Sequence, residues 1–184
     1  HRQLCRAGPG AAARLGILVR GGSYLELGRH LTLLALDKTG TITRGRPEVT
    51  DVVSWGDLEP AEVLRRAAAL EGPSEHPVAA AVLARYGQTP PALEEFDSLT
   101  GRGVRGRLEG CEYYLGNHRL VEERGVCSRE LEARLDELEE QGKTAVVLMD
   151  DTRALGIIAV ADTIREGAAE ALTELHQLGL KVML

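Results

Sequence analysis

Apolar residues recur three to four positions apart in several stretches of the chain, which is the spacing of one helix face. In residues 59–71 this repeat includes Val63, Leu64, Ala67 and Ala68. A proline at the start of such a stretch and a glycine just after it mark where a helix begins and ends. The pattern therefore predicts helices over residues 59–71, 77–86, 128–141 and 165–178, and a short helix within residues 11–19.

Shorter apolar or alternating runs lie between these helices and predict strands. Residues 103–116 contain two such runs on either side of Glu109-Gly110, which is typical of a β-hairpin. An Asp150-Asp151 turn joins two further runs in the same way. The predicted strands cover residues 31–36, 47–54, both halves of 103–116, 144–149, 155–160 and 181–184, and residues 88–95 are predicted as a proline-containing loop.

The order of these elements predicts an α/β domain interrupted by a second domain. The strand at 31–36 and the strand–helix–strand order over 155–184 favour a parallel α/β sheet. The helices and short strands between them favour an inserted α+β domain. The predicted boundaries give a connector over residues 1–30, the first part of the α/β domain over 31–45, the insert over 46–153 and the second part over 154–184.

Composition and charge exclude several classes of protein. The net charge of −6 argues against a general nucleic-acid or membrane-surface binder. The cysteines Cys5, Cys111 and Cys127 are far apart and form no C-x-x-C pair, so a disulfide framework or structural metal site is not expected. No run of about 18 apolar residues is present, and the basic residues 1–10 lack the apolar segment of a signal peptide.

The chemistry suggested by the chain begins at Asp37, directly after the predicted strand 31–36. Ligands of α/β folds bind at the carboxyl ends of parallel strands, where this carboxylate is expected to lie. Lys38, Thr39 and the glycine that follows offer a cation, a hydroxyl and a flexible turn, which suit a phosphoryl group. Asp37 could attack the phosphorus and form an aspartyl-phosphate, with Mg²⁺ offsetting the charge of the phosphate oxygens.

The seven residues Asp37–Thr43, DKTGTIT, match the phosphorylation signature of the P-type ATPases, with Ile42 where leucine is commoner. The chain resembles the ATP-handling part of the heavy-metal-transporting members of that family over residues 11–184. The resemblance implies that Asp37 is the phosphorylated nucleophile, that Lys38 contacts the phosphate, and that Thr39 helps to hold phosphate and Mg²⁺. Phosphatases of the haloacid dehalogenase type share the fold but usually carry a second Asp at the position of Thr39, which speeds loss of the phosphate.

A second set of matches lies in the insert. Ser74-Glu75-His76-Pro77 resembles a sequence characteristic of the heavy-metal pumps, in which the histidine contacts adenine. Glu71 lies where that family has an acidic residue on the adenine side. Gly101-Arg102-Gly103 and Gly116-Asn117 match its GxG and GN pairs, of which Gly101, Gly103 and Asn117 are expected at the nucleotide. Without the resemblance, His76 would be interpreted as a helix-capping surface residue and the glycines as a turn. The chain has no Walker A sequence, which disfavours a P-loop fold.

Asp162 and Arg165 resemble a conserved Asp and Arg of the family's phosphorylation domain, and Asp162 is alternatively a helix N-cap. The TGD and GDGxND segments of the family, the second of which supplies further Mg²⁺ ligands, are not in this sequence. Membrane helices and a Cys-Pro-Cys metal site are not in it either. We therefore expect this segment to bind nucleotide but to show little ATPase turnover by itself.

The resemblance implies a partial haloacid-dehalogenase-like, Rossmann-like phosphorylation domain, residues 31–45 and 154–184, with the nucleotide-binding domain inserted at 46–153. Residues 1–30 would be a membrane-proximal connector. The implied ligands are ATP and Mg²⁺, and the implied partners are a heavy-metal cation bound by a membrane domain and an actuator domain, without nucleic acid. The parent protein is expected to be a multi-pass protein of the cell membrane, with this segment on the cytoplasmic side.

Two stretches bear on the transported metal. The segment over residues 21–53 and YYLGNHRL over 113–120 resemble the zinc, cadmium and lead pumps more than the copper pumps. The expected parent is therefore an ATP-driven exporter of one of these cations. The alternatives are a copper-exporting P-type ATPase, a soluble phosphatase of the haloacid dehalogenase type with a cap domain, and a non-catalytic nucleotide-binding module.

Overall fold

A computed structural model describes residues 13–14, 16–19 and 22–184 of the chain. The chain divides into two compact units. Unit 1 comprises His1–Ile42 and Arg165–Leu184, and unit 2 comprises Thr43–Ile164. Of residues 11–19, where a short helix was predicted, the structure describes 13–14, which are helical, and 16–19, which form a turn and an irregular segment. Residues 1–10 lie outside the described residues.

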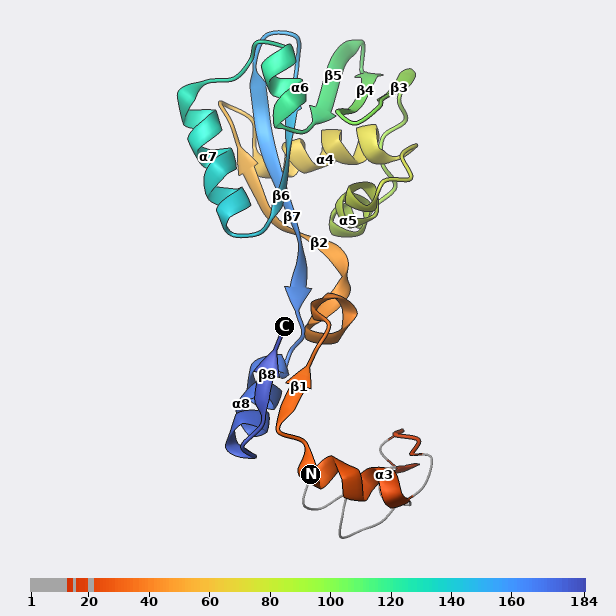
Figure 1. The fold of residues 1–184 in the computed structure, drawn as a ribbon. Coiled ribbons are helices and arrows are strands. Elements are labelled where there is room, and N and C mark those ends of the chain that lie inside the picture. Colours follow the sequence, from red (N-terminus) through yellow and green to blue (C-terminus); the bar gives the residue numbers. More distant parts are fainter. Residues whose placement is uncertain (1–12, 15, 20–21) are drawn as a thin grey trace. The chain divides into compact units, whose positions relative to one another are not determined.

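Unit 2 is built on one six-stranded sheet in which every pair of neighbouring strands is antiparallel. The β4–β5 hairpin turns at Glu109-Gly110, which confirms the predicted hairpin. In the order in which they lie across the sheet (Figure 1), the strands are β2 (Thr43–Ser54), β7 (Ala154–Ile164), β6 (Thr144–Met149), β5 (Cys111–Gly116), β4 (Gly103–Leu108) and β3 (Glu95–Leu99).

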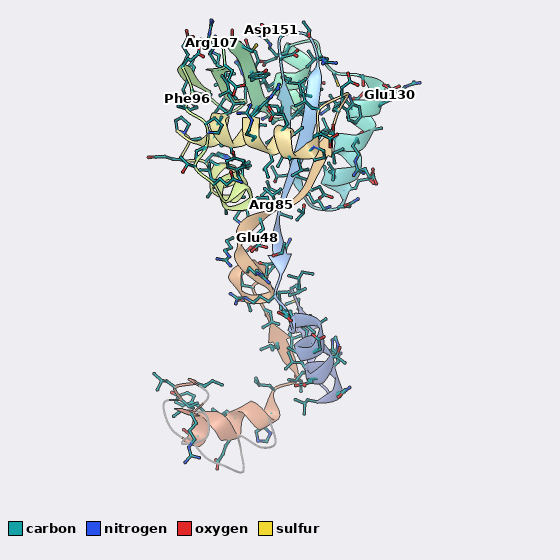
Figure 2. The ribbon with its side chains drawn as sticks, turned by 180° about the vertical axis from the view of Figure 1, so that it is seen from behind. Glu48, Arg85, Phe96, Arg107, Glu130 and Asp151 are labelled. Atoms are coloured by element: carbon teal, nitrogen blue, oxygen red, sulfur yellow. The ribbon has the colours of Figure 1, made fainter. Side chains whose placement is uncertain are left out.

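Helices cover both faces of this sheet (Figure 1). The helices α4 (Pro60–Glu71) and α5 (Pro77–Tyr86) pack on one face, and α6 (His118–Glu123) and α7 (Arg129–Glu140) pack on the other. Figure 2 shows unit 2 from behind, with Phe96 of the edge strand β3 at one side and Glu130 of α7 at the other. Each face therefore has its own hydrophobic core.

The strand β7 is buried on both of its faces. Ile158 and Val160 belong to the core under α4 and α5, whereas Ile157 and Ala159 belong to the core under α6 and α7. Successive side chains of a strand point to opposite faces, so an apolar residue is needed at every position. This explains the continuous apolar run in the sequence.

Unit 1 contains the only parallel strand pair of the described residues, β1 (Leu33–Ala35) with β8 (Lys181–Met183). The helix α8 (Ala168–Gln177) precedes β8, and none of its residues is fully buried. Ahead of β1 lie α3 (Gly22–Leu27) and a 3₁₀ turn, η1 (Gly28–His30). A kinked turn, η2 (Lys38–Ile42), follows β1.

The strand predicted over residues 155–160 belongs to a different sheet from the one expected. Its apolar pattern predicted a place in the parallel α/β sheet, but β7 pairs antiparallel with β2 and β6 in unit 2. A strand with two buried faces has the same continuous apolar pattern as a strand of a parallel sheet, so the pattern could not separate the two. The unit borders accordingly fall at Thr43 and Ile164, compared with the predicted 46 and 153.

Other elements differ from prediction for local reasons. The strand predicted over 31–36 is the three-residue β1, in which Leu33 remains 50% exposed because a two-stranded sheet covers little surface. The edge strand β3 and the six-residue α6 were not predicted, since neither is long enough or regular enough in pattern. Helix α7 is confirmed, and Ser128 is its N-cap, with Oγ accepting from Leu131 N at 3.2 Å.

Candidate functional site

Asp37 lies at the carboxyl end of the parallel strand pair in unit 1. The amide of Leu36 donates to the carbonyl of Met183 at 2.9 Å, which extends the β1–β8 pairing to the residue before Asp37. The Asp37 side chain is exposed, and its Oδ1 accepts from the amide of Thr39 at 3.3 Å. Gly40 then adopts φ +76°, a left-handed conformation that glycine reaches without strain. The loop thus turns sharply and presents the carboxylate to solvent.

Arg165 holds this loop from the far end of the sequence. Its guanidinium Nη2 donates to the carbonyl of Gly40 at 2.9 Å, and its backbone amide donates to the carbonyl of Ile42 at 2.8 Å. These two hydrogen bonds fix the backbone at Gly40 and Ile42, directly after Asp37, Lys38 and Thr39. Arg165 therefore positions the loop within unit 1.

Asp162 lies inside β7 and is not a helix N-cap, because α8 begins after Gly167. Its Oδ2 accepts from Thr43 Oγ1 at 2.5 Å, and its Oδ1 accepts from the amide of Gly45 at 2.9 Å. These bonds bridge the register shift between Thr43 and Pro47 in the β2–β7 pairing. Asp162 consequently ties β2 to β7 next to the border of unit 2.

In unit 2, the turn between α4 and α5 brings Glu71 and His76 together. The amide of Ser74 donates to the carbonyl of Glu71 at 3.0 Å, and Ser74 Oγ accepts from the amide of His76 at 3.3 Å. His76 is the N-cap of α5, where its Nδ1 accepts from Val78 N at 3.3 Å. In the neutral imidazole the proton then sits on Nε2, which remains a donor.

The Glu71 carboxyl is an unusual group for its position. The residue is 5% exposed, and its Oε2 is buried without a hydrogen-bond partner in the described part of the chain. Burial raises the pKa of this carboxyl, while a hydrogen bond from Ser74 and the nearby His76 lower it by less. A buried acceptor without a partner costs free energy, so the site gains when a ligand donor reaches it.

The remaining predicted residues meet where β4 begins and β5 ends. The amide of Asn117 donates to the carbonyl of Arg102 at 2.9 Å, and its side-chain Nδ2 donates to the carbonyl of Gly101 at 3.1 Å. Asn117 Oδ1 also caps α6 by accepting from Leu120 N at 3.2 Å. One asparagine thus fixes the Gly101–Gly103 turn to the start of α6.

A side chain at Gly101 and one at Gly103 would meet different surroundings. A Cβ on Gly103, at φ +150°, would lie 2.1 Å from the carbonyl oxygen of Leu115 and 2.5 Å from Cα of Gly116. Glycine is therefore required there by the close contact of β4 with β5. A Cβ on Gly101, at φ +69°, would meet no described atom within 4 Å, so the outer side of this residue is open.

The α4–α5 turn and the Gly101–Gly103 turn both lie next to the same hydrophobic core. Leu70, Val78, Val104 and Leu115 all belong to the cluster under α4 and α5. Each of them is one or two residues away from Glu71, His76, Gly103 or Gly116 in the sequence. The core therefore holds the α4–α5 turn and the Gly101–Gly103 turn in a fixed relation within unit 2.

Sequence reasoning missed two residues of this region. Ser74 links Glu71 to His76, and a serine two residues before a helix N-cap is a signal for such a turn. Arg102 is the only lysine or arginine within the Gly101–Gly103 turn and the Glu71–Val78 stretch. Its charge beside two expected site residues was the available signal.

Metal-binding clusters and membrane-spanning helices are both absent from the described residues. Residues 13–14, 16–19 and 22–184 contain no cluster of three or more His, Cys, Asp or Glu side chains arranged to hold a metal ion. Over the same described ranges, no helix combines the length and the apolar character that a bilayer crossing requires.

Comparisons with known proteins agree on the relatives of the chain. A probable copper-exporting P-type ATPase V of Mycobacterium tuberculosis is 42% identical over 179 residues, which cover 95% of this chain and 23% of that protein. A probable cadmium-transporting ATPase of Staphylococcus aureus is also 42% identical, over 94% of this chain and 25% of that protein. The chain thus spans about a quarter of the length of these curated relatives.

Solved structures show the same likeness. The crystal structure of a zinc-transporting PIB-type ATPase in the E2.Pi state matches 97% of this chain and 29% of that chain, with a TM-score of 0.85 and 35% identity. The N-domain of a copper-transporting P-type ATPase matches 63% of this chain and 99% of its own, with a TM-score of 0.53 and 22% identity, which shows a shared fold.

The family is shown by a model of haloacid dehalogenase-like hydrolases that matches residues 31–184. This range includes the Asp37 loop and all of unit 2. It also agrees with the α/β fold class predicted from the sequence. The chain therefore belongs to the haloacid dehalogenase-like hydrolases, and its similar curated relatives are heavy-metal P-type ATPases.

Proposed function

We propose that this chain is the nucleotide-binding and phosphate-accepting portion of an ATP-driven heavy-metal cation exporter. The observation that supports this most directly is the DKTGTIT loop, which leaves Asp37 exposed at the carboxyl end of a parallel strand pair. The similarity to copper- and cadmium-transporting P-type ATPases over about 95% of the chain points to the same activity. Parent proteins of this class are expected in a membrane, with this segment on the cytoplasmic side.

In the proposed reaction, a carboxylate oxygen of Asp37 attacks the γ-phosphorus of ATP, and the bond to the bridging oxygen of ADP breaks. Lys38 would contact the transferred phosphoryl group. Asp37 and the hydroxyl of Thr39 are hard oxygen donors of the kind that Mg²⁺ prefers, and they would hold the ion together with phosphate and water oxygens. Bound Mg²⁺ supplies positive charge that offsets the phosphate oxygens.

Thr39 distinguishes a phosphorylated pump from a phosphatase. Its backbone amide donates to Asp37 Oδ1, so this residue lies next to the proposed phosphate-accepting group. A threonine hydroxyl does not act as a general acid or base near neutral pH, whereas a carboxyl at this position does. The aspartyl-phosphate is therefore expected to persist long enough to drive a conformational cycle.

For the nucleotide we propose a site formed by Glu71, His76, Gly101, Gly103 and Asn117. The base would be bound by His76, whose Nδ1 is engaged in the helix cap while Nε2 remains a donor, and by the unpartnered Oε2 of Glu71. Gly101 offers an open surface, and Asn117 fixes the turn. The capping roles of His76 and Asn117 are compatible with ligand binding, because each uses only part of the side chain.

The phosphorylation step is tested on the full-length parent protein. Given ATP radiolabelled at the γ-phosphate and the transported metal, it should acquire an acid-stable, hydroxylamine-labile label, and Asp37→Asn should abolish the label. Thr39→Asp should shorten the lifetime of the phosphoenzyme by about a hundredfold, because a general acid/base contributes about 10²–10⁴ in rate. A parent that never becomes labelled would disprove the proposal.

Nucleotide binding is tested separately on the 184-residue chain. Titration calorimetry should show ATP binding, and His76→Gln should weaken it about tenfold by removing ring contact with the base. Tyr86→Phe, a change in α5 away from the turn, serves as the control. Binding that is lost on His76→Gln, combined with a parent that is never phosphorylated at Asp37, would instead favour a non-catalytic nucleotide-binding module.

The transported cation is proposed to be Zn²⁺, Cd²⁺ or Pb²⁺. A zinc-transporting structure with a TM-score of 0.85 and a cadmium-transporting relative support this choice. A copper-exporting relative of equal identity makes Cu⁺ the competing cargo. Phosphoenzyme formation in the full-length parent should be stimulated by the divalent cations, and stimulation by Cu⁺ alone would reassign the cargo.

A further inference from the structure

Arg102 lies between Gly101 and Gly103, beside the nucleotide site proposed above, and its role rests on that site. The backbone of Arg102 is fixed on both sides. Its amide donates to the carbonyl of Leu99 at 2.9 Å, and its carbonyl accepts from the amide of Asn117 at 2.9 Å. The root of this side chain is therefore anchored among the expected site residues, while the side chain itself is 44% exposed.

The guanidinium of Arg102 is held by one carboxylate that it shares. Nη1 of Arg102 lies 3.2 Å from Oε2 of Glu123, at the end of α6. The other oxygen of Glu123, Oε1, pairs with Nε of Arg119 at 3.1 Å. Two arginines on one carboxylate leave an excess of one positive charge at this edge. That excess lies beside the site in a chain whose net charge is −6.

One neighbouring carboxylate on α6 offsets this excess in number, and a further arginine is already paired. Glu122 is exposed on the same helix. Arg124, which follows the helix, pairs with Asp151 and lies over the ring of Tyr114 at 3.9 Å from its centroid. The region around Glu123 is thus neutral in sum, and Arg102 is the guanidinium in it whose backbone belongs to the Gly101–Gly103 turn.

We propose that Arg102 binds a phosphate group of the nucleotide, and that Glu123 holds its guanidinium while the site is empty. An exposed ion pair between two side chains is weak, because water competes for both partners. A guanidinium fork and a phosphate form a stronger, bidentate, charge-assisted pair. Exchange of Glu123 for a phosphate is therefore favourable, and the side chain needs only to rotate about its anchored root.

The chain offers a matched control for this proposal. Arg119 carries the same charge and pairs with the same carboxylate, but it lies on α6 outside the Gly101–Gly103 turn and is 68% exposed. If only the general positive charge mattered, removing either arginine would weaken ATP binding equally. The proposal requires that only Arg102 matters.

The experiment is titration calorimetry of the 184-residue chain with ATP and, separately, with adenosine. Arg102→Ala should weaken ATP binding about tenfold and leave the Kd for adenosine unchanged within about twofold, because adenosine has no phosphate. Arg102→Lys should give an intermediate loss, because lysine keeps the charge but not the fork. Arg119→Ala should change neither Kd by more than about twofold.

Removing the competing carboxylate should have the opposite effect. Glu123→Gln frees Arg102 and should tighten ATP binding about two- to threefold, with adenosine unaffected. ATP binding that is unchanged in Arg102→Ala, or weakened equally in Arg119→Ala, would overturn the proposal. An equal loss for ATP and adenosine would also overturn it, because the role would then be structural. A wild-type chain that binds adenosine but not ATP would contradict only the phosphate-binding role of Arg102. A chain that binds neither would refute the proposed function as well.

Discussion

Units 1 and 2 bury their apolar residues to very different extents. In unit 2, two hydrophobic clusters fill both faces of a six-stranded sheet. In unit 1, Leu180 is the one buried hydrophobic residue among those described, and Leu33 and Met183 of its strand pair remain 50% and 55% exposed. Isolated pairs of strands are at best marginally stable, whereas a sheet covered on both faces has a core of its own.

This difference in packing also distinguishes the proposed nucleotide site in unit 2 from the Asp37 loop in unit 1. The residues expected at the nucleotide stand on the well-packed core of unit 2, so their geometry is fixed by buried side chains. The Asp37 loop in unit 1 is held by a few hydrogen bonds, of which two come from Arg165. We therefore expect nucleotide binding to be robust to changes outside unit 2, and the phosphate-accepting loop to depend on individual contacts.

The largest expected effect tests the packing difference directly. Ile158→Ala, in the core under α4 and α5, should lower the free energy of unfolding of unit 2 by about 3 kcal/mol. Leu172→Ala, on the half-buried face of α8, should cost about 1 kcal/mol or less. Urea unfolding followed by fluorescence of the single tryptophan, Trp55, reports on unit 2, and circular dichroism reports on both units. An equal loss of unfolding free energy in the two variants would contradict the difference in packing between the two units.

The next effect separates the two glycines of the Gly101–Gly103 turn. Gly103→Ala places a Cβ 2.1 Å from the carbonyl oxygen of Leu115 and should cost about 2–3 kcal/mol, since the strands must move apart. Gly101→Ala meets no described atom and should cost only about 1 kcal/mol, for a left-handed backbone. Chemical unfolding of both variants gives the two values, and a similar cost at both positions would contradict the packing reason given for Gly103.

A somewhat smaller effect is expected at the border of unit 2. Asp162→Ala removes the acceptor of Thr43 Oγ1 and of the Gly45 amide, and should lower the stability of unit 2 by about 1–2 kcal/mol. The control is Asp97→Ala, which breaks an exposed ion pair with Arg105 and should cost less than about 1 kcal/mol. Urea midpoints that do not distinguish the two variants would show that the Asp162 contacts stabilise unit 2 no more than an exposed ion pair does.

The smallest effect depends on pH and concerns Glu71. Burial raises the pKa of this carboxyl in the folded chain above the ordinary 4.5 of the unfolded chain. The folded state therefore retains a proton that the unfolded state has lost, and stability falls as the pH rises from 4.5 through the raised pKa. Glu71→Gln removes this dependence and should be about 1 kcal/mol more stable than wild type at pH 7.

The control for Glu71 is Glu75→Gln, in the same turn but exposed, which should leave stability unchanged at every pH. The stabilisation by Glu71→Gln should vanish below about pH 4, where both states of the wild type are protonated. Thermal unfolding measured between about pH 4 and pH 8 checks both variants. A Glu71→Gln variant that is less stable at pH 7 would show that the carboxylate has a favourable partner when it is ionised.

Local signals in the sequence determined several parts of this protein. The DKTGTIT loop after an apolar run, the hairpin turn at Glu109-Gly110 and the start of α7 after Ser128 were all predicted, and the last two are confirmed. His76 at the start of α5 was also predictable, since a histidine before Pro77 at a helix start suits a cap. Caps, turns and periodic patterns depend on residues only a few positions apart, so the sequence displays them directly.

The tertiary structure alone decided which strands pair and which side chains meet across them. The sequence could not show that β7 belongs to the antiparallel sheet of unit 2, because a strand buried on both faces has the same pattern in either kind of sheet. Asp162 and Thr43 are 119 residues apart, and Arg165 and Gly40 are 125 residues apart. The requirement for glycine at 103 likewise arises from a carbonyl on the neighbouring strand. Contacts between distant residues exist only once the sheet has formed, and no local pattern encodes them.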